Sequence, residues 1–119
     1  MLVNDLIGHY TIIGTNQDDS ENTYTGELFL TKNANNTIDA RWLINNEQEQ
    51  FGKGYLEKNV LTIHFYYYGD NNTIFKGKVL YKIITKDILE GKWFEEFGNP
   101  IFFGTENCFR AKSNALKLN

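Results

Sequence analysis

Apolar and polar residues alternate along most of this chain. Between residues 61 and 66, Leu61, Ile63 and Phe65 alternate with Thr62, His64 and Tyr66. A period of two is typical of a β-strand whose two faces meet different surroundings. The same alternation predicts eight strands, near residues 8–14, 23–32, 37–45, 49–57, 60–68, 73–84, 87–94 and 101–110.

Short polar segments such as NANN, NNEQ and GDNN separate these strands, and their residue types favour turns. Most connections are short, so strands that are neighbours in sequence should pair as antiparallel hairpins. The acidic loop at 15–22 is the longer exception. We expect a single domain over residues 1–119 with a short tail, 111–119. An ordered final turn is favoured for this tail, because Leu116 and Leu118 would otherwise be exposed.

Glycine recurs in the middle of the strands, with bulky residues two positions away on the same face. Tyr24-x-Gly26-x-Leu28 and Leu89-x-Gly91-x-Trp93 are examples. Glycine weakens a flat strand, but a strand that bends to close a barrel requires it, and an aromatic neighbour can cover the gap. The pattern predicts an all-β, antiparallel up-and-down meander in a closed or nearly closed barrel. A twisted open sheet and a sandwich are the alternatives.

The glycine face is predicted to point inward, because the opposite face carries most of the lysines and acids. So many inward rings on a short chain favour a barrel filled by its own side chains over a hollow cup with hydroxyl and indole donors at its rim. The inward rings that would line such a cup are Tyr24, Trp42, Tyr67, Tyr81 and Trp93.

The outward face also carries aromatic residues, which a purely solvated face would not need. A contiguous apolar surface usually marks an interface, and Tyr and Phe are common at interface centres. The residues predicted to form such a surface are Phe51, Tyr55, His64, Tyr66 and Tyr68.

The net charge is -3 and the lysines are scattered, so nucleic acid is not expected as a partner. Cys108 is the only cysteine, which excludes an intrachain disulfide and a cysteine-based zinc site. The N-terminus has no basic start and no segment is long and apolar enough to cross a membrane. A cytoplasmic protein without a cofactor is therefore expected.

No residue set predicts catalysis or metal binding. Cys108 has no histidine near it in sequence, and His9 and His64 fall on different strands of the outward face. The carboxylates of Asp18, Asp19 and Glu21 lie in a polar loop, where solvation is expected; Glu95 and Glu96 form a second pair. We expect no metal site and no enzyme.

Gly8-His9-Tyr10 opens the first predicted strand, and Arg110 lies in the last one. With the eight-strand meander, these residues resemble the calycin group of lipocalin, fatty-acid-binding and avidin-type barrels. The resemblance implies that Arg110 packs over Tyr10 as a cation–π pair. It also implies a small ligand in the barrel interior.

Two functions follow from these faces. The first is a protein-binding module, of the inhibitor or adaptor type or self-associating as a homodimer, which acts through the outward aromatic residues. The alternative is a carrier or sensor that holds a small apolar ligand among the inward rings.

Overall fold

A computed structural model describes residues 1–18, 20 and 22–112 of the chain. Most of the predicted tail lies outside the described residues, as do Asp19 and Glu21. No helix among the described residues is long and apolar enough to span a bilayer.

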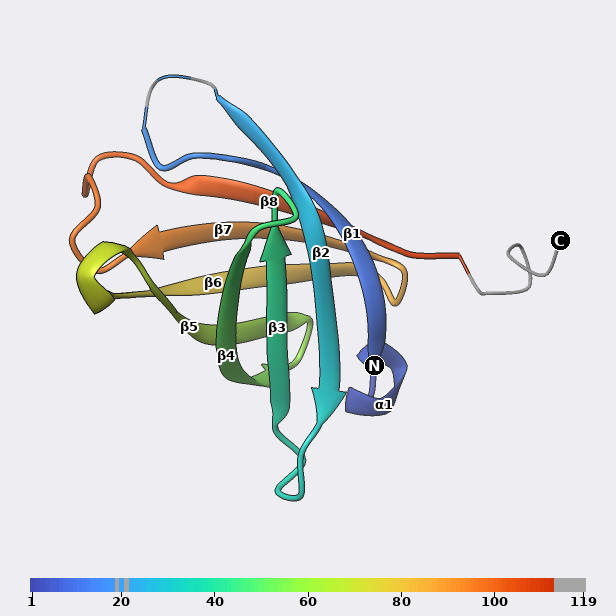
Figure 1. Cartoon of the computed structure of the whole chain (residues 1–119). Coiled ribbons are helices and arrows are strands. Elements are labelled where there is room, and N and C mark those ends of the chain that lie inside the picture. Colours follow the sequence, from blue (N-terminus) through green and yellow to red (C-terminus); the bar gives the residue numbers. More distant parts are fainter. Residues whose placement is uncertain (19, 21, 113–119) are drawn as a thin grey trace, which may run out of the picture.

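Eight antiparallel strands form a closed barrel in which each strand pairs with the next and β8 pairs back onto β1 (Figure 1). The predicted all-β meander and its closure are confirmed. A helical turn precedes the strands and a second short turn separates β5 from β6. The elements are α1 (Val3–Leu6), β1 (Gly8–Thr15), β2 (Thr23–Lys32), β3 (Ile38–Ile44), β4 (Gln48–Glu57), β5 (Val60–Tyr68), η1 (Asp70–Asn72), β6 (Ile74–Thr85), β7 (Ile88–Glu95) and β8 (Gly104–Arg110).

The structure differs from the predicted elements at the start of the last strand and before the first strand. The last strand begins at Gly104 rather than 101, because the segment after Pro100 turns and leaves Ile101 exposed. The helix α1 was not predicted, since one turn is too short to show a helical period. The carboxylate of Asp5 accepts a hydrogen bond from the Leu2 backbone N–H at 2.9 Å, which stabilises this turn.

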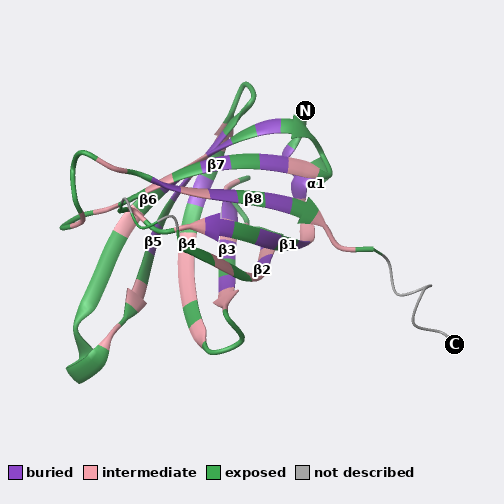
Figure 2. Ribbon diagram, turned by 90° about the horizontal axis from the view of Figure 1, so that it is seen from above, coloured by how far each residue is buried: buried purple, intermediate pink, exposed green. Residues whose placement is uncertain are grey.

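The inward and outward faces are those that the alternation predicts. In β5, Leu61, Ile63 and Phe65 are buried, whereas His64 and Tyr66 on the opposite face are exposed and Thr62 is half-buried. Figure 2 shows the same alternation in the other strands, with the buried segments concentrated in the half of the barrel near α1. The core therefore fills that half.

The mid-strand glycines lie where another group presses on the backbone. A Cβ on Gly52 would come within 2.7 Å of the His64 carbonyl oxygen on the neighbouring strand. A Cβ on Gly91 would come within 2.6 Å of the Tyr81 ring, which covers this position as an aromatic neighbour was expected to do. Larger side chains at these positions would force the wall apart, because real Cβ contacts this short are not tolerated.

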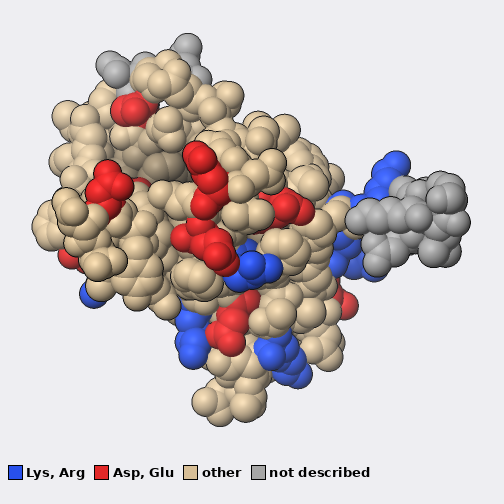
Figure 3. All heavy atoms as spheres, viewed as in Figure 1, with Lys and Arg blue, Asp and Glu red and all other residues tan. Residues whose placement is uncertain are grey.

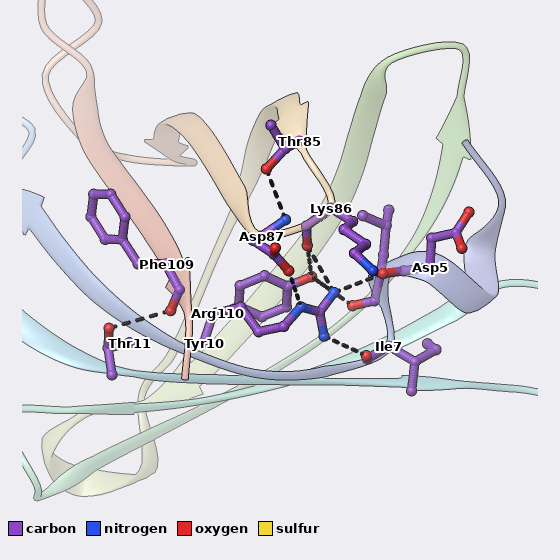
Figure 4. A network of polar contacts seen from close by, with 10 residues as sticks. Asp5, Ile7, Tyr10, Thr11, Thr85, Lys86, Asp87, Phe109 and Arg110 are labelled. Atoms are coloured by element: carbon purple, nitrogen blue, oxygen red, sulfur yellow. Dashed lines mark hydrogen bonds and ion pairs between the residues drawn. The ribbon is translucent and has the colours of Figure 1, made fainter. Parts of the chain in front are cut away.

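Arg110 and α1 close one end of the barrel (Figure 4). The guanidinium donates hydrogen bonds to the backbone oxygens of Asp5, Ile7 and Lys86 at 2.7–2.9 Å and pairs with the Asp87 carboxylate at 2.7 Å. Its central carbon lies 4.8 Å from the centre of the Tyr10 ring, so the expected cation–π pair is confirmed. We call this the closed end.

Candidate functional site

The opposite, open end of the barrel holds a cavity of about 260 Å³. The prediction of a filled barrel is therefore correct for the closed half and wrong for the open half. The closed half is filled by α1 and by large buried residues such as Tyr10 and Leu30. The cavity is lined by Asn16, Thr23, Tyr24, Trp42, Ile44, Asn45, Gln48, Gln50, Phe65, Tyr67, Val79, Trp93, Glu95 and Glu106.

Four aromatic rings form the apolar wall of the cavity, and we call them the ring cluster: Trp42, Phe65, Tyr67 and Trp93. Phe65 is at its centre. The Phe65 ring meets Trp42 edge-on at 6.0 Å between ring centres and Trp93 edge-on at 6.5 Å, and it stacks with Tyr67 at 6.5 Å. The rings come from β3, β5 and β7, and they face inward because each occupies an inward position of the strand alternation.

Glu106 forms the polar floor of the cavity and is only 5% exposed. Its carboxylate accepts hydrogen bonds from the Tyr24 hydroxyl at 2.7 Å, from Trp42 Nε1 at 3.0 Å and from the Tyr81 hydroxyl. Burial raises the pKa of the Glu106 carboxyl, while the donors from Tyr81, Tyr24 and Trp42 act in the opposite direction. Burial also raises the pKa values of Tyr24 and Tyr81, so both hydroxyls keep their protons and remain donors.

A second carboxylate, Glu95, lies nearer the open end. The Glu95 carboxylate accepts a hydrogen bond from the Tyr67 hydroxyl. The backbone N–H of Glu95 donates to the side-chain oxygen of Gln17 at 2.7 Å. The Gln17 side-chain nitrogen donates in turn to the Asn99 carbonyl at 2.9 Å. Gln17 thus ties the β1–β2 and β7–β8 connections together beside the cavity mouth.

One donor in the wall is unused. Trp93 Nε1 is buried and has no hydrogen-bond partner among the described residues. A buried donor without a partner costs about 1–3 kcal/mol. Trp93 Nε1 lies against the wall at Gly104, where a Cβ would come within 2.3 Å of it. Near the mouth, the Gln50 side-chain nitrogen donates to the Gln48 side-chain oxygen at 2.8 Å.

Four of the five inward rings predicted for a ligand cup, Tyr24, Trp42, Tyr67 and Trp93, do line the cavity. Tyr81 lies under the floor, where its hydroxyl bonds Glu106. The sequence interpretation assigned no role to Glu106 or to the amides at the mouth, and it considered Glu95 only as one of a pair of carboxylates with Glu96. The available signal was alternation, which places Glu106 on the same inward face as Cys108.

Three of the five predicted outward residues contact each other, and we call Phe51, Tyr66 and Tyr68 the outer aromatic surface. The Phe51 and Tyr66 rings are 5.8 Å apart and the Tyr66 and Tyr68 rings 6.0 Å apart. Lys53 separates Phe51 from Tyr55 along β4, and it lies opposite His64 on β5. Tyr55 and His64 are thus exposed on the same wall but outside the outer aromatic surface.

The remaining candidates for chemistry lie away from the cavity. Cys108 is fully buried, and burial raises the pKa of its thiol. On the outer face, His9 hydrogen-bonds Glu27 at 2.7 Å and stacks on Phe29. Asp18 accepts hydrogen bonds from Ser20, which lower the pKa of its carboxyl. Within the part of the chain that the structure describes, no three metal-ligating side chains come together.

No protein-family model matches the sequence, and no curated protein matches it either. The fold does have solved counterparts. A redesigned β-barrel, b11L5F_LGL, has a TM-score of 0.75 at 14% identity, over 92% of this chain and 95% of that one. A redesigned β-barrel, mFAP1, bound to DFHBI has a TM-score of 0.71 at 17% identity, over 91% of this chain and 97% of that one. These matches show the fold alone.

A third counterpart, EF1p2_mFAP2b, is also described as bound to DFHBI; it has a TM-score of 0.69 at 15% identity. The closed eight-stranded barrel is therefore shown, whereas membership of the calycin group remains a resemblance.

Proposed function

We propose that this chain is a carrier or sensor that binds a small, ring-containing ligand in the open half of its barrel. The observation that carries the proposal is the cavity itself, which combines the ring cluster with the buried carboxylate of Glu106. Seven of the fourteen lining residues are aromatic or aliphatic and seven are polar or acidic. In ligand sites, apolar walls supply affinity and fixed polar groups supply orientation. The solved barrels described as bound to DFHBI have the same fold and are consistent with this use.

The size of the cavity limits the ligand. Its volume of about 260 Å³ lies just below the range of about 300–1,000 Å³ typical of drug-sized ligands. We therefore expect one or two fused rings with short substituents rather than a long acyl chain. Flat rings would pack between Trp42, Phe65 and Trp93 with little loss of contact.

Binding is favoured over catalysis by the positions of the reactive side chains. The Cys108 thiol is buried and its raised pKa disfavours the thiolate that a nucleophile needs. Both histidines lie on the outer face, away from the cavity, so neither can serve as a base there. We propose that the protein is not an enzyme.

The neutral naphthalene dye prodan tests the proposal. Its emission should rise and shift to shorter wavelength on addition of the protein, because its rings leave water and pack against the ring cluster. Gln50→Trp should abolish this change, since Gln50 lines the cavity and a large ring there would fill it. Glu49→Trp is the matched control, because its neighbour Glu49 points outward and is exposed. Equal emission changes with both variants would place the dye elsewhere and reject the proposal.

The outer aromatic surface supports a second candidate, a protein-binding module, because Tyr66 and Tyr68 are 39% and 56% exposed while their rings contact each other. If this surface binds a protein or a second copy of the chain, native mass spectrometry should detect a complex with the wild type and none with the Tyr66→Ser, Tyr68→Ser double variant. Tyr55→Ser, on the same wall but outside the surface, should leave it intact. A complex that survives the double substitution would rule out this role.

A further inference from the structure

The cavity contains acidic side chains but no basic one. Glu95 and Glu106 both line it, and the other lining residues are neutral. The donors to Glu106 are two hydroxyls and an indole, all of them uncharged. Within residues 1–18, 20 and 22–112, neither carboxylate has an ion-pair partner.

A buried carboxylate without a cation is costly, and proteins normally pair it or keep it protonated. Glu106 uses three of about four lone-pair positions that a carboxylate offers, so it can accept one more donor. In Glu95, Oε1 accepts the Tyr67 hydroxyl and no described hydrogen bond uses the other oxygen. Both carboxylates can therefore receive a donor from a ligand.

The ring cluster suits the same kind of ligand. The faces of indole, phenol and phenyl rings carry partial negative charge and attract cations within about 6 Å. Trp42, Phe65, Tyr67 and Trp93 surround the space beside the two carboxylates. A positively charged nitrogen would meet favourable charge from the walls and from the floor.

The connections at the open end add to this field. The described residues of the connections at the open end are 16–18, 20, 22, 45–47, 69–73 and 96–103, and none of them is Lys, Arg or His. Their acidic residues include Glu47, Asp70 and Glu96. Figure 3 shows acidic side chains at the upper left of the molecule, where the β1–β2 and β7–β8 connections lie in Figure 1. Lysines and arginines lie lower and to the right, where further acidic side chains accompany them.

We propose that the ligand is a small organic cation: a flat ring system bearing a protonated amine or amidine, held between the ring cluster and the carboxylates of Glu95 and Glu106. The inference rests on the proposed ligand-binding function and narrows it to one chemical class.

Three naphthalenes that differ in charge test the inference: naphthylmethylamine, naphthalenemethanol and naphthoate. Calorimetric titration of the full chain at neutral pH should give the tightest binding for the amine, weaker binding for the alcohol and none for the carboxylate. A charge-assisted hydrogen bond worth about 1.4 kcal/mol more than a neutral one predicts about tenfold between amine and alcohol.

Substitutions assign this preference to the cavity. Glu106→Gln should lower the affinity for the amine about tenfold and leave that for the alcohol nearly unchanged. Glu95→Gln tests the other carboxylate if the Glu106 variant fails to fold. Glu90→Gln is the matched control, because Glu90 is exposed on the outer face of β7 and its substitution removes the same charge.

The outcomes separate the inference from the function on which it rests. Amine and alcohol binding equally well would overturn the cation inference and leave ligand binding intact. Equal losses in the Glu106, Glu95 and Glu90 variants would also overturn it, because the preference would then reflect net charge alone. Failure of all three naphthalenes to bind, together with no prodan response, would overturn the ligand-binding function as well.

Discussion

At the scale of single residues, the buried carboxyl of Glu106 makes stability depend on pH. Its pKa is raised in the folded protein, chiefly by burial, so the folded state holds this proton more tightly than the unfolded state. The contribution of Glu106 to stability is thus fully present below its unfolded pKa and is lost as pH rises through the folded value. The loss amounts to about 1.4 kcal/mol for each unit by which the pKa is raised.

Replacing Glu106 by glutamine removes this titration. We therefore expect the free energy of unfolding of the wild type, relative to Glu106→Gln, to fall as pH rises above the ordinary pKa of a glutamate carboxyl. Urea unfolding at a series of pH values measures the difference. Glu90→Gln corrects for the loss of one acidic residue. A wild-type-minus-variant difference that stays flat, or that rises with pH, would contradict the assignment.

Arg110 is a second residue whose hydrogen-bond partners make it important for the stability of the fold. It joins α1, β1 and the β6–β7 turn through backbone oxygens, the Tyr10 hydroxyl and Asp87. Arg110→Met would leave these acceptors unpaired at the closed end and should cost about 3 kcal/mol of unfolding free energy. Arg41→Met is matched to it, because Arg41 also pairs with an acid, Glu49, and lies over a ring, Phe29.

The two arginines differ in exposure. The Arg41 side chain is 49% exposed and that of Arg110 is 25% exposed. Exposed pairs contribute little, so we expect Arg41→Met to cost less than about 1 kcal/mol. Denaturant unfolding of both variants measures the difference. Similar losses would mean that the network around Arg110 contributes no more than a surface pair.

At the scale of elements, α1 closes the barrel with two side chains. Val3 and Leu6 are buried against the core, and the Tyr10 hydroxyl donates to the Leu6 carbonyl at 2.9 Å. Leu6→Ala should destabilise the protein by about 2–5 kcal/mol, as for other buried leucines. Leu2→Ala, at a position that is 71% exposed, should cost about 0.5 kcal/mol or less. Thermal unfolding of both variants measures the costs, and equal shifts would show that α1 does not seal the core.

The elements also show how far the sequence determines this fold. The strands and their faces were predictable, because Leu61, Ile63 and Phe65 repeat with the period of a strand. Barrel closure followed from glycines such as Gly91, where Tyr81 leaves no room for a Cβ. The helix α1 was not predictable, because a single turn has no period and its stability comes from packing.

The site was only half predictable for a related reason. Alternation places Tyr24, Trp42 and Trp93 inside, but it cannot tell whether inward rings meet or leave a gap between them. That depends on how far opposite walls stand apart, which is set by the whole closed sheet. Glu106 was missed because its donors come from strands distant in sequence, at separations of 25 to 82 residues.

At the scale of the whole molecule, charge is distributed between the two ends of the barrel. The closed end carries Lys58, Lys86 and Arg110 together with Asp5 and Asp87, whereas the described connections of the open end carry acids and no Lys, Arg or His. An acidic rim around a low-dielectric hollow concentrates cations at the mouth and speeds their entry. The rim acts on the rate of arrival, while the two carboxylates inside act on retention.

These two roles predict different salt responses. The association rate constant of naphthylmethylamine, measured by stopped flow, should fall several-fold as the Debye length shrinks from about 30 Å to about 3 Å, since the rim is exposed to screening. Its dissociation rate constant should change less, because the cavity excludes most of the salt. Naphthalenemethanol, which has no charge, should show neither effect.

A matched pair of variants separates the rim from net charge. Glu47→Gln with Asp70→Asn removes two rim acids and should reduce the salt dependence of association for the amine. Glu57→Gln with Glu90→Gln removes the same charge away from the rim, in β4 and β7, and should leave that dependence nearly unchanged. Steering by the rim requires the first pair to have the larger effect, because screened potentials act over short distances. If both pairs reduce the dependence equally, the amine responds to the net charge of the molecule and the asymmetry of the two ends has no kinetic role.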